Sequence, residues 1–239
     1  MRLEEKNYFD TIAQAFDTDF NVYGKPSGIL RVERRVKLFI EYCRLKPGLK
    51  ILEIGCGTGE YTRAMIHYGL NLFATDFSLN MVRRAQKKLN TAENGIFFLS
   101  DVELLPLRGD SFDAVLGNSI LHHLEVEKAL RQIYRVLKKG GRIAFSEPNM
   151  CNPQIFLQKK IKLLKKLAGD SSGEKAFYRW FLSRMLERSG FKNIVVRPFD
   201  FMHPSTPASL VKIIDKVGAF FEKTPLREVA GSLFITGEK

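Results

Sequence analysis

The sequence has few cysteines and no long uncharged hydrophobic run. Its three cysteines, Cys43, Cys56 and Cys151, form no Cys-x-x-Cys pair, which argues against a disulfide framework or a zinc site and favours a reducing cytoplasm. The apolar stretches are shorter than the roughly 18 residues that suggest a membrane-spanning helix, and residues 1–6 lack the apolar core of a secretory signal. We therefore expect a cytoplasmic protein without a metal site.

What the sequence does contain is a full set of core-forming residues and an excess of basic ones. Hydrophobic residues make up 45% of its 239 residues, which excludes disorder as the dominant state, and the length fits one domain. The 38 lysines and arginines exceed the 26 aspartates and glutamates, and two thirds of the resulting net charge of +12 falls in residues 151–239. Such a charge suggests nucleic acids or anionic membranes as partners.

Short apolar runs alternate with longer amphipathic stretches between residues 50 and 147. The runs cover residues 50–54, 72–75, 96–99, 114–116 and 142–146. Helix-like stretches such as 78–89 and 126–137 lie between them. This alternation predicts an α/β fold, with a mostly parallel sheet and helices on both of its faces.

Three segments add to this core within a single domain spanning residues 1–239. They are an N-terminal helical segment at 1–48 and two cap insertions at 148–173 and 202–230. A helix at 176–189 and strands at 193–198 and 232–236 resume the regular pattern. We expect the two insertions to cap the substrate site.

The two insertions have different characters. The first contains Phe156–Ala168, a basic amphipathic stretch with five lysines and no acidic residue. It is either a lid helix with a solvated lysine face or a contact with an anionic membrane, which would make the protein membrane-peripheral. In the second insertion Leu210, Ile214, Val217 and Phe221 share one helical face, which we expect to form a wall of an apolar pocket.

The clearest functional pattern is the run Ile-Leu-Glu-Ile-Gly-Cys-Gly-Thr-Gly at residues 51–59. A strand here leads directly into three alternate glycines and then a helix. Glycine permits a positive φ and lets the backbone approach a ligand, and the start of a helix offers free N–H groups. A dinucleotide fingerprint would need glycine at position 60, where Glu60 stands. The loop therefore argues against a nicotinamide oxidoreductase.

The segment from Glu53 to Gly59 resembles motif I of the class I S-adenosylmethionine (SAM) dependent methyltransferases, in which an acid and an apolar residue precede Gly-x-Gly-x-Gly. The resemblance covers about residues 8–147 in order and spacing. Tyr8–Ala13 is similar to the N-terminal segment of methyltransferases that act on quinones and related small molecules. The resemblance implies a Rossmann-like seven-stranded sheet with an antiparallel last strand, SAM as cofactor and S-adenosyl-L-homocysteine as product.

The resemblance also implies which residues bind the cofactor. Asp76 occupies the position that hydrogen-bonds the ribose hydroxyls, and Asp101 and Val102 match the adenine site. The full implied set is Glu53, Gly55, Cys56, Gly57, Gly59, Asp76, Phe77, Asp101, Val102 and Asn118. Aspartate is also favoured in helix and turn caps, which is the alternative for Asp76 and Asp101.

Catalysis by such a site depends mostly on positioning, because the sulfonium of SAM is already a good leaving group. A base is needed only when the nucleophile holds a proton at neutral pH. The candidate catalytic residues are Asn118, His122 and His123, near the end of the predicted fourth strand. His203 and Glu147 are weaker candidates. The histidine pair also has a structural interpretation, since similar sequences recur in the superfamily without being catalytic in all members.

We expect methyl transfer from SAM to a small-molecule or lipid-like acceptor. The basic charge raises an RNA or other nucleic-acid methyltransferase as the alternative. However, Asn118-Ser119-Ile120-Leu121 lacks both prolines of the Asn-Pro-Pro-aromatic sequence that is frequent in amino-methylating enzymes of that type. A non-catalytic SAM-binding module is a third interpretation, and the sequence predicts no particular oligomeric state.

Overall fold

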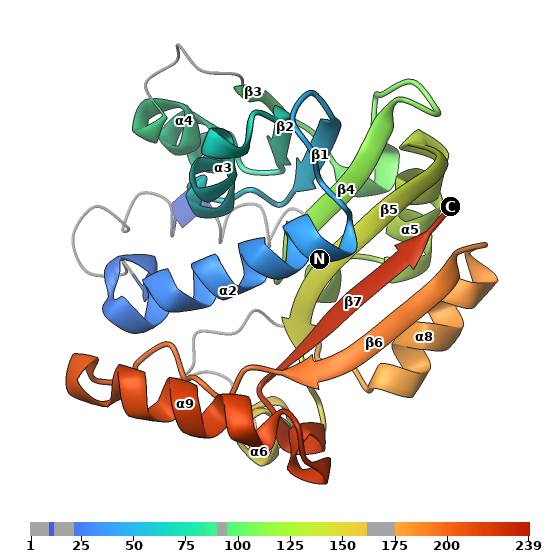
Figure 1. Cartoon of the computed structure of the whole chain (residues 1–239). Coiled ribbons are helices and arrows are strands. Elements are labelled where there is room, and N and C mark those ends of the chain that lie inside the picture. Colours follow the sequence, from blue (N-terminus) through green and yellow to red (C-terminus); the bar gives the residue numbers. More distant parts are fainter. Residues whose placement is uncertain (1–9, 12–21, 90–94, 162–174) are drawn as a thin grey trace.

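The computed structural model describes residues 10–11, 22–89, 95–161 and 175–239, and its centre is a seven-stranded sheet (Figure 1). The strands are β1 (Lys50–Ile54), β2 (Asn71–Asp76), β3 (Gly95–Leu99), β4 (Phe112–Asn118), β5 (Leu137–Pro148), β6 (Lys192–Phe199) and β7 (Ser232–Glu238). Their order is β3-β2-β1-β4-β5-β7-β6. The first five strands run parallel, and β7 is antiparallel to both β5 and β6. The predicted fold class, including the antiparallel last strand, is confirmed.

Helices cover both faces of this sheet (Figure 1). The α-helices are α2 (Pro26–Tyr42), α3 (Glu60–Met65), α4 (Leu79–Lys88), α5 (Val126–Val136), α6 (Pro153–Lys160), α8 (Arg179–Arg188) and α9 (Val211–Phe221). The 3₁₀ turns are η1 (Val22–Gly24), η2 (Ile66–Tyr68), η3 (Val102–Leu104), η4 (Leu121–His123), η5 (Ala208–Leu210) and η6 (Pro225–Val229). One core lies between the sheet and α2 and α3, and the larger one lies between the sheet and α5 and α8.

The sequence explains why these elements form. In β1 every residue from Ile51 to Ile54 is buried, as expected for a central parallel strand covered on both faces. In α5 the buried residues recur at the spacing of one helical face, and they are Val126, Ala129, Leu130, Ile133 and Val136. Gly55 and Gly57 after β1 have φ of +65° and +51°, a conformation that glycine adopts at little cost.

The strand β5 is longer than its apolar run predicts. It begins at Leu137 and includes the polar residues 138–142, while the prediction began at Arg142. The extra length follows from tertiary pairing, because Leu137 pairs with Phe112 of β4 and Arg142 pairs with Glu238 of β7. The Lys-Lys-Gly-Gly sequence, which has weak strand propensity, lies between these two paired positions, where the register with β4 shifts.

The predicted cap insertions are only partly described. The helix α6 covers the first half of Phe156–Ala168 and ends at Lys160, and residues 162–174 lie outside the described part of the chain. The second insertion folds as η5, α9 and η6. Within the described ranges, no helix combines the length and apolar character that crossing a bilayer requires.

A buried ion pair fixes α2 to the sheet. The Arg35 guanidinium lies 2.7 Å from Asp200 Oδ2 and donates to the hydroxyls of Ser146 and Ser232, both at 3.0 Å. Arg31 Nε donates to the same Asp200 oxygen at 2.9 Å. Burial acts to raise the pKa of Asp200, but Arg35 and Arg31 outweigh it and lower this pKa to about 2. One carboxylate therefore joins α2 to the end of β6.

Replacing Asp200 tests this joint. We expect Asp200→Asn to lower the free energy of unfolding at neutral pH by about 3–5 kcal/mol, since Arg35 would stay buried without its counter-charge. The folded-state pKa of Asp200 is lowered, so its stabilisation is present above about pH 4 and is lost as the pH falls towards 2. Urea unfolding of wild type and variant at several pH values measures this, and their free energies of unfolding should converge as the pH falls towards 2.

The matched control removes an exposed ion pair. Lys128 Nζ lies 2.7 Å from Glu125 Oε2, and both side chains are more than half exposed. Lys128→Ala should change the free energy of unfolding by less than about 1 kcal/mol. Equal losses in the two variants would contradict the structural role assigned to Asp200.

Candidate active site

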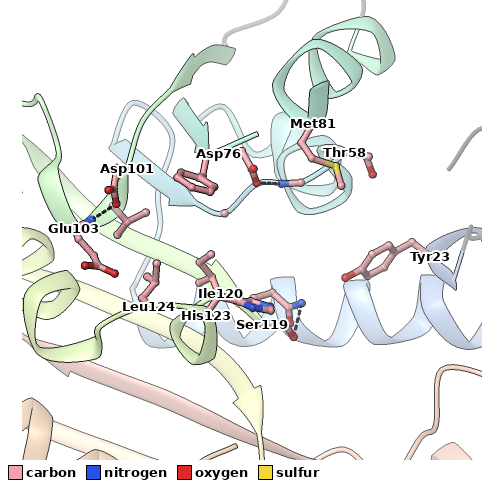
Figure 2. A pocket seen from close by; sticks show the side chains of 15 residues that line it. Tyr23, Thr58, Asp76, Met81, Asp101, Glu103, Ser119, Ile120, His123 and Leu124 are labelled. Atoms are coloured by element: carbon pink, nitrogen blue, oxygen red, sulfur yellow. Dashed lines mark hydrogen bonds between the residues drawn. The ribbon is translucent and has the colours of Figure 1, made fainter. Parts of the chain in front are cut away.

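A cavity of about 220 Å³ lies at the carboxyl ends of β1, β2 and β4 (Figure 2). Ligands of open α/β folds bind at this edge of the sheet, where loops from neighbouring strands converge. The residues that line the cavity are Tyr23, Gly55, Gly57, Thr58, Asp76, Phe77, Met81, Asp101, Val102, Glu103, Asn118, Ser119, Ile120, His123 and Leu124. The cavity is therefore built from the glycine loop, two acidic strand ends and the turn after β4.

The glycines of the loop serve two different purposes. A Cβ on Gly55 would lie 2.6 Å from the side chain of Ile120, so this glycine makes room for a neighbouring side chain. A Cβ on Gly57 would meet nothing within 4 Å, and Gly57 also lines the cavity. Its backbone is thus open to close approach by a ligand.

Asp76 connects the glycine loop to the start of α4. Its Oδ2 accepts a hydrogen bond from the Gly57 N–H at 2.8 Å, and its Oδ1 accepts one from the Ser78 N–H at 2.9 Å. Burial raises the pKa of Asp76, although these backbone donors act against the increase. The carboxylate also lines the cavity (Figure 2). Capping and ligand contact, the two interpretations of this residue, are therefore compatible.

The second acidic strand end has a similar construction. Asp101 lies just beyond β3, and its Oδ1 accepts a hydrogen bond from the Glu103 N–H at 2.9 Å at the start of η3. Val102 is buried beside it, and both residues line the cavity with Glu103. Figure 2 shows Asp101 and Glu103 at one end of the cavity, away from Tyr23. This end therefore pairs a carboxylate with an apolar surface.

Three residues of the implied cofactor set support the loop without lining the cavity. Glu53 is buried, its Oε2 accepts a hydrogen bond from the Thr62 hydroxyl at 2.5 Å, and burial raises its pKa to about 8. Cys56 is buried too, and burial raises the pKa of its thiol, so it is a poor nucleophile. Gly59 begins α3 with φ +83° against Ala85. The other seven residues of the set line the cavity.

The turn after β4 separates the two histidines. Glu147, at the end of β5, accepts the N–H groups of Ile120 at 2.9 Å and Leu121 at 2.8 Å, and its other oxygen lies 2.6 Å from His122 Nδ1. His122 is 4% exposed and does not line the cavity, whereas His123 does. The structure therefore assigns the two predicted candidates different positions, one in the core and one at the cavity wall.

Asn118 carries an acceptor atom without a donor. Its Oδ1 is buried and has no hydrogen-bond partner among the described residues, while its Nδ2 donates to the Ser119 hydroxyl at 3.2 Å. Leaving a buried carbonyl unsatisfied costs free energy. Because Asn118 lines the cavity, an N–H or O–H group of a bound ligand could satisfy it.

Several lining residues were not predicted from the sequence. Tyr23, Thr58, Met81, Glu103, Ser119, Ile120 and Leu124 all line the cavity. Tyr23 comes from η1 and packs edge-on against Tyr61, with ring centroids 6.2 Å apart, and burial raises the pKa of its hydroxyl. Its approach to the strand ends depends on the path of the N-terminal segment, for which no local pattern gives a signal.

The second insertion does not reach the described cavity. His203 does not line it, and its Nδ1 accepts the Ser205 N–H at 3.1 Å. The helical face predicted to form a pocket wall is also absent from the lining, and Leu210 and Val217 of that face are 44% and 47% exposed. The helix α9 packs inward through Val211 and Gly218 instead. The predicted pocket wall is therefore not part of this cavity, and a cap over the acceptor site stays a prediction.

The cavity lining is unusual in its charge. Among the described residues that form it there are three carboxylates, Asp76, Asp101 and Glu103, and no lysine or arginine. The basic excess of the chain therefore lies elsewhere. The described residues also contain no cluster of three or more histidine, cysteine, aspartate or glutamate side chains that could hold a metal ion.

Comparison with known proteins identifies the family. Residues 52–145 match the model of a methyltransferase domain. Demethylmenaquinone methyltransferase of Staphylococcus aureus is 30% identical over 65% of this chain and 73% of that protein, and phosphoethanolamine N-methyltransferase 1 of Arabidopsis thaliana is 27% identical over 73% of this chain and 38% of that protein. The crystal structure of a SAM-dependent methyltransferase from Thermotoga maritima covers 98% of this chain and 99% of its own, with a TM-score of 0.69 at 21% identity. This chain belongs to the class I SAM-dependent methyltransferases.

Proposed function

We propose that the protein transfers the methyl group of SAM to a small, uncharged and largely apolar acceptor of the quinol or lipid-linked kind. The observation that carries this proposal is the absence of lysine and arginine from the described cavity lining. A nucleic acid would bring phosphates that need basic partners, and a phosphate-bearing small molecule would need the same. Ile120 and Leu124 instead offer apolar contact.

The described side chains fit the cofactor of the family. SAM supplies a methyl group activated by a sulfonium leaving group. As the family resemblance implies, Asp76 would accept hydrogen bonds from the ribose diol, and Asp101 with Val102 would hold the adenine ring. That all three line the described cavity supports these roles. The unpartnered Oδ1 of Asn118 suits a donor such as the ammonium group of SAM. These residues bind and orient, which is most of what methyl transfer requires.

His123 is our candidate for handling a proton. An acceptor with a hydroxyl group must lose its proton as the new bond forms, and an imidazole can take that proton near neutral pH. Among the four histidines of the chain, His123 is the one that lines the described cavity. Tyr23 stays protonated, because burial raises its pKa, so its hydroxyl can donate to an acceptor oxygen. His122 is a positioning residue, acting through Glu147 and the turn.

The first test concerns the cofactor. Asp76→Ala should raise the dissociation constant for SAM about 10- to 100-fold, because hydrogen bonds to a charged carboxylate contribute about 1.5–3 kcal/mol each. Isothermal titration with SAM measures this. The control is Asp113→Ala, which removes a carboxylate bonded to the Lys50 N–H and Lys138 Nζ at the opposite end of β4. Its affinity for SAM should stay within about twofold of wild type.

The second test concerns the acceptor. Tritiated SAM is incubated with the protein and one of three acceptors: a reduced demethylmenaquinone, phosphoethanolamine or mixed RNA. We expect label only in the quinol, because the described cavity lining holds no lysine or arginine for a phosphate. Label in phosphoethanolamine or RNA would refute the apolar acceptor, and tight SAM binding without transfer would favour a SAM-binding module.

The third test separates the two histidines. His123→Ala and His122→Ala should both keep SAM affinity near the wild-type value. Turnover should fall about 10²–10⁴-fold in His123→Ala if it removes the base. His122→Ala should instead lower the free energy of unfolding by about 1–3 kcal/mol, because Glu147 loses a buried partner. Methyl-transfer kinetics and urea unfolding measure the two effects, and full activity in His123→Ala would exclude it as the base.

A further inference from the structure

The helix α9 is bound to the rest of the protein by one face only. Gly218 is buried, and a Cβ there would lie 3.3 Å from the side chain of Phe201. Arg34 of α2 pairs with Asp215 at 3.4 Å and with Glu222 at 2.7 Å. The two acidic residues of this segment therefore point towards α2. The inward face of α9 is held by packing at Gly218 and by these ion pairs.

The opposite face of α9 is apolar and exposed. Ile213, Val217 and Phe220 are 59%, 47% and 64% exposed. Their spacing of four and then three residues places them along one stripe of the helix. Single exposed apolar residues are ordinary on protein surfaces, but a continuous stripe of large ones marks an interaction surface.

A row of lysines runs beside this stripe. Lys212, Lys216 and Lys223 are all exposed. The spacing of Lys212 and Lys216 places them on one side of α9, next to the apolar residues and away from Arg34, and Lys223 follows in the turn just after the helix ends at Phe221. Within the described residues, none of these three lysines forms an ion pair. Because Asp215 and Glu222 face α2, the outer surface of α9 combines apolar side chains with positive charge alone.

Neighbouring segments at the same end of the molecule have the same character. The turn η6 contacts α9, and its Leu226 is 54% exposed. Asn152, which caps α6, donates its Nδ2 to the Val229 carbonyl of η6 at 2.8 Å. On α6, Phe156 and Leu157 are 40% and 49% exposed. Figure 1 shows α9 and α6 together beyond the ends of β5 and β6.

We propose that the outer face of α9 lies against the surface of an anionic phospholipid membrane. Large apolar side chains bordered by lysines are the pattern of a helix that lies in the membrane interface. The lysine stems can extend along apolar surface while their ammonium groups reach the headgroups. A protein partner could also bury the apolar stripe, but the uniformly positive border favours a negatively charged surface. This docking requires neither SAM nor an acceptor.

Vesicle co-sedimentation of the full chain tests the proposal without cofactor or acceptor. A failure of the membrane proposal would therefore leave the proposed methyl transfer untouched. Vesicles of phosphatidylcholine containing phosphatidylglycerol are compared with vesicles of phosphatidylcholine alone, at low and high salt. We expect binding to the anionic vesicles at low salt, weakening as salt screens the lysines. Equal binding to both kinds of vesicle, or none to either, would overturn the proposal.

Charge variants locate the surface. The triple variant Lys212→Gln/Lys216→Gln/Lys223→Gln should partition about 100-fold less onto anionic vesicles, since each lysine near such a surface contributes about fivefold. A control with the same net charge replaces the exposed residues Lys37, Lys87 and Lys192 by glutamine, and it should stay much closer to wild type. Equal losses in the two triple variants would refute a specific role for α9.

Apolar variants complete the test. Val217→Ser/Phe220→Ser should weaken vesicle binding about tenfold or more, while Ile96→Ser/Leu104→Ser, at residues 54% and 76% exposed near β3, should not. Retained SAM binding shows that each variant is folded. If wild type instead forms a dimer in solution that Val217→Ser/Phe220→Ser dissociates, a second copy covers the stripe and the membrane proposal is wrong.

Discussion

Glu147 holds the turn after β4 through both of its carboxylate oxygens, and the arrangement of the site depends on that contact. Two backbone N–H groups and the His122 ring converge on this buried side chain. This turn places the Ile120 side chain in the space left by two glycines. A Cβ on Gly55 would lie 2.6 Å from that side chain, and a Cβ on Gly117 would lie 2.8 Å from it. The glycine loop and the turn that carries His123 are therefore one packed unit. A change on the cofactor side cannot leave the opposite wall of the cavity unaffected.

The arginines of α2 connect the sheet to the second insertion, which contains α9. A buried arginine is costly to desolvate, and here the cost is offset by a complete set of partners around Arg35. Arg34, one residue earlier, binds Asp215 and Glu222 of the α9 segment. The same helix begins directly after η1, which carries Tyr23 into the cavity. Anchoring α2 on the sheet thus places both a lining residue and the helix α9, although these are far apart in the sequence.

Local sequence patterns were sufficient to predict the glycine loop and Asp76, because a strand, a tight turn and a helix start follow one another directly along the chain. The same reasoning predicted the sheet and its antiparallel last strand, the latter through the family resemblance. It could not distinguish His122 from His123, since their difference depends on a carboxylate that is 25 residues away. Nor could it place Tyr23, or extend β5 back to Leu137, which pairs with Phe112 of β4 across a shift in register. Contacts between distant segments, rather than weak local signals, explain what was missed.

The location of the charge matters more than its total. The net charge of +12 alone is compatible with a nucleic-acid enzyme. The described cavity lining favours another acceptor, because it has three carboxylates and no lysine or arginine. Such a lining attracts the positively charged sulfonium of SAM. Methyl transfer removes that charge, while the ribose and adenine groups assigned to Asp76 and Asp101 are the same in cofactor and product. The basic residues lie away from this cavity. Arg31, Arg34 and Arg35 of α2 pair with acids of other segments, and the exposed lysines of α9 face the outside of the molecule.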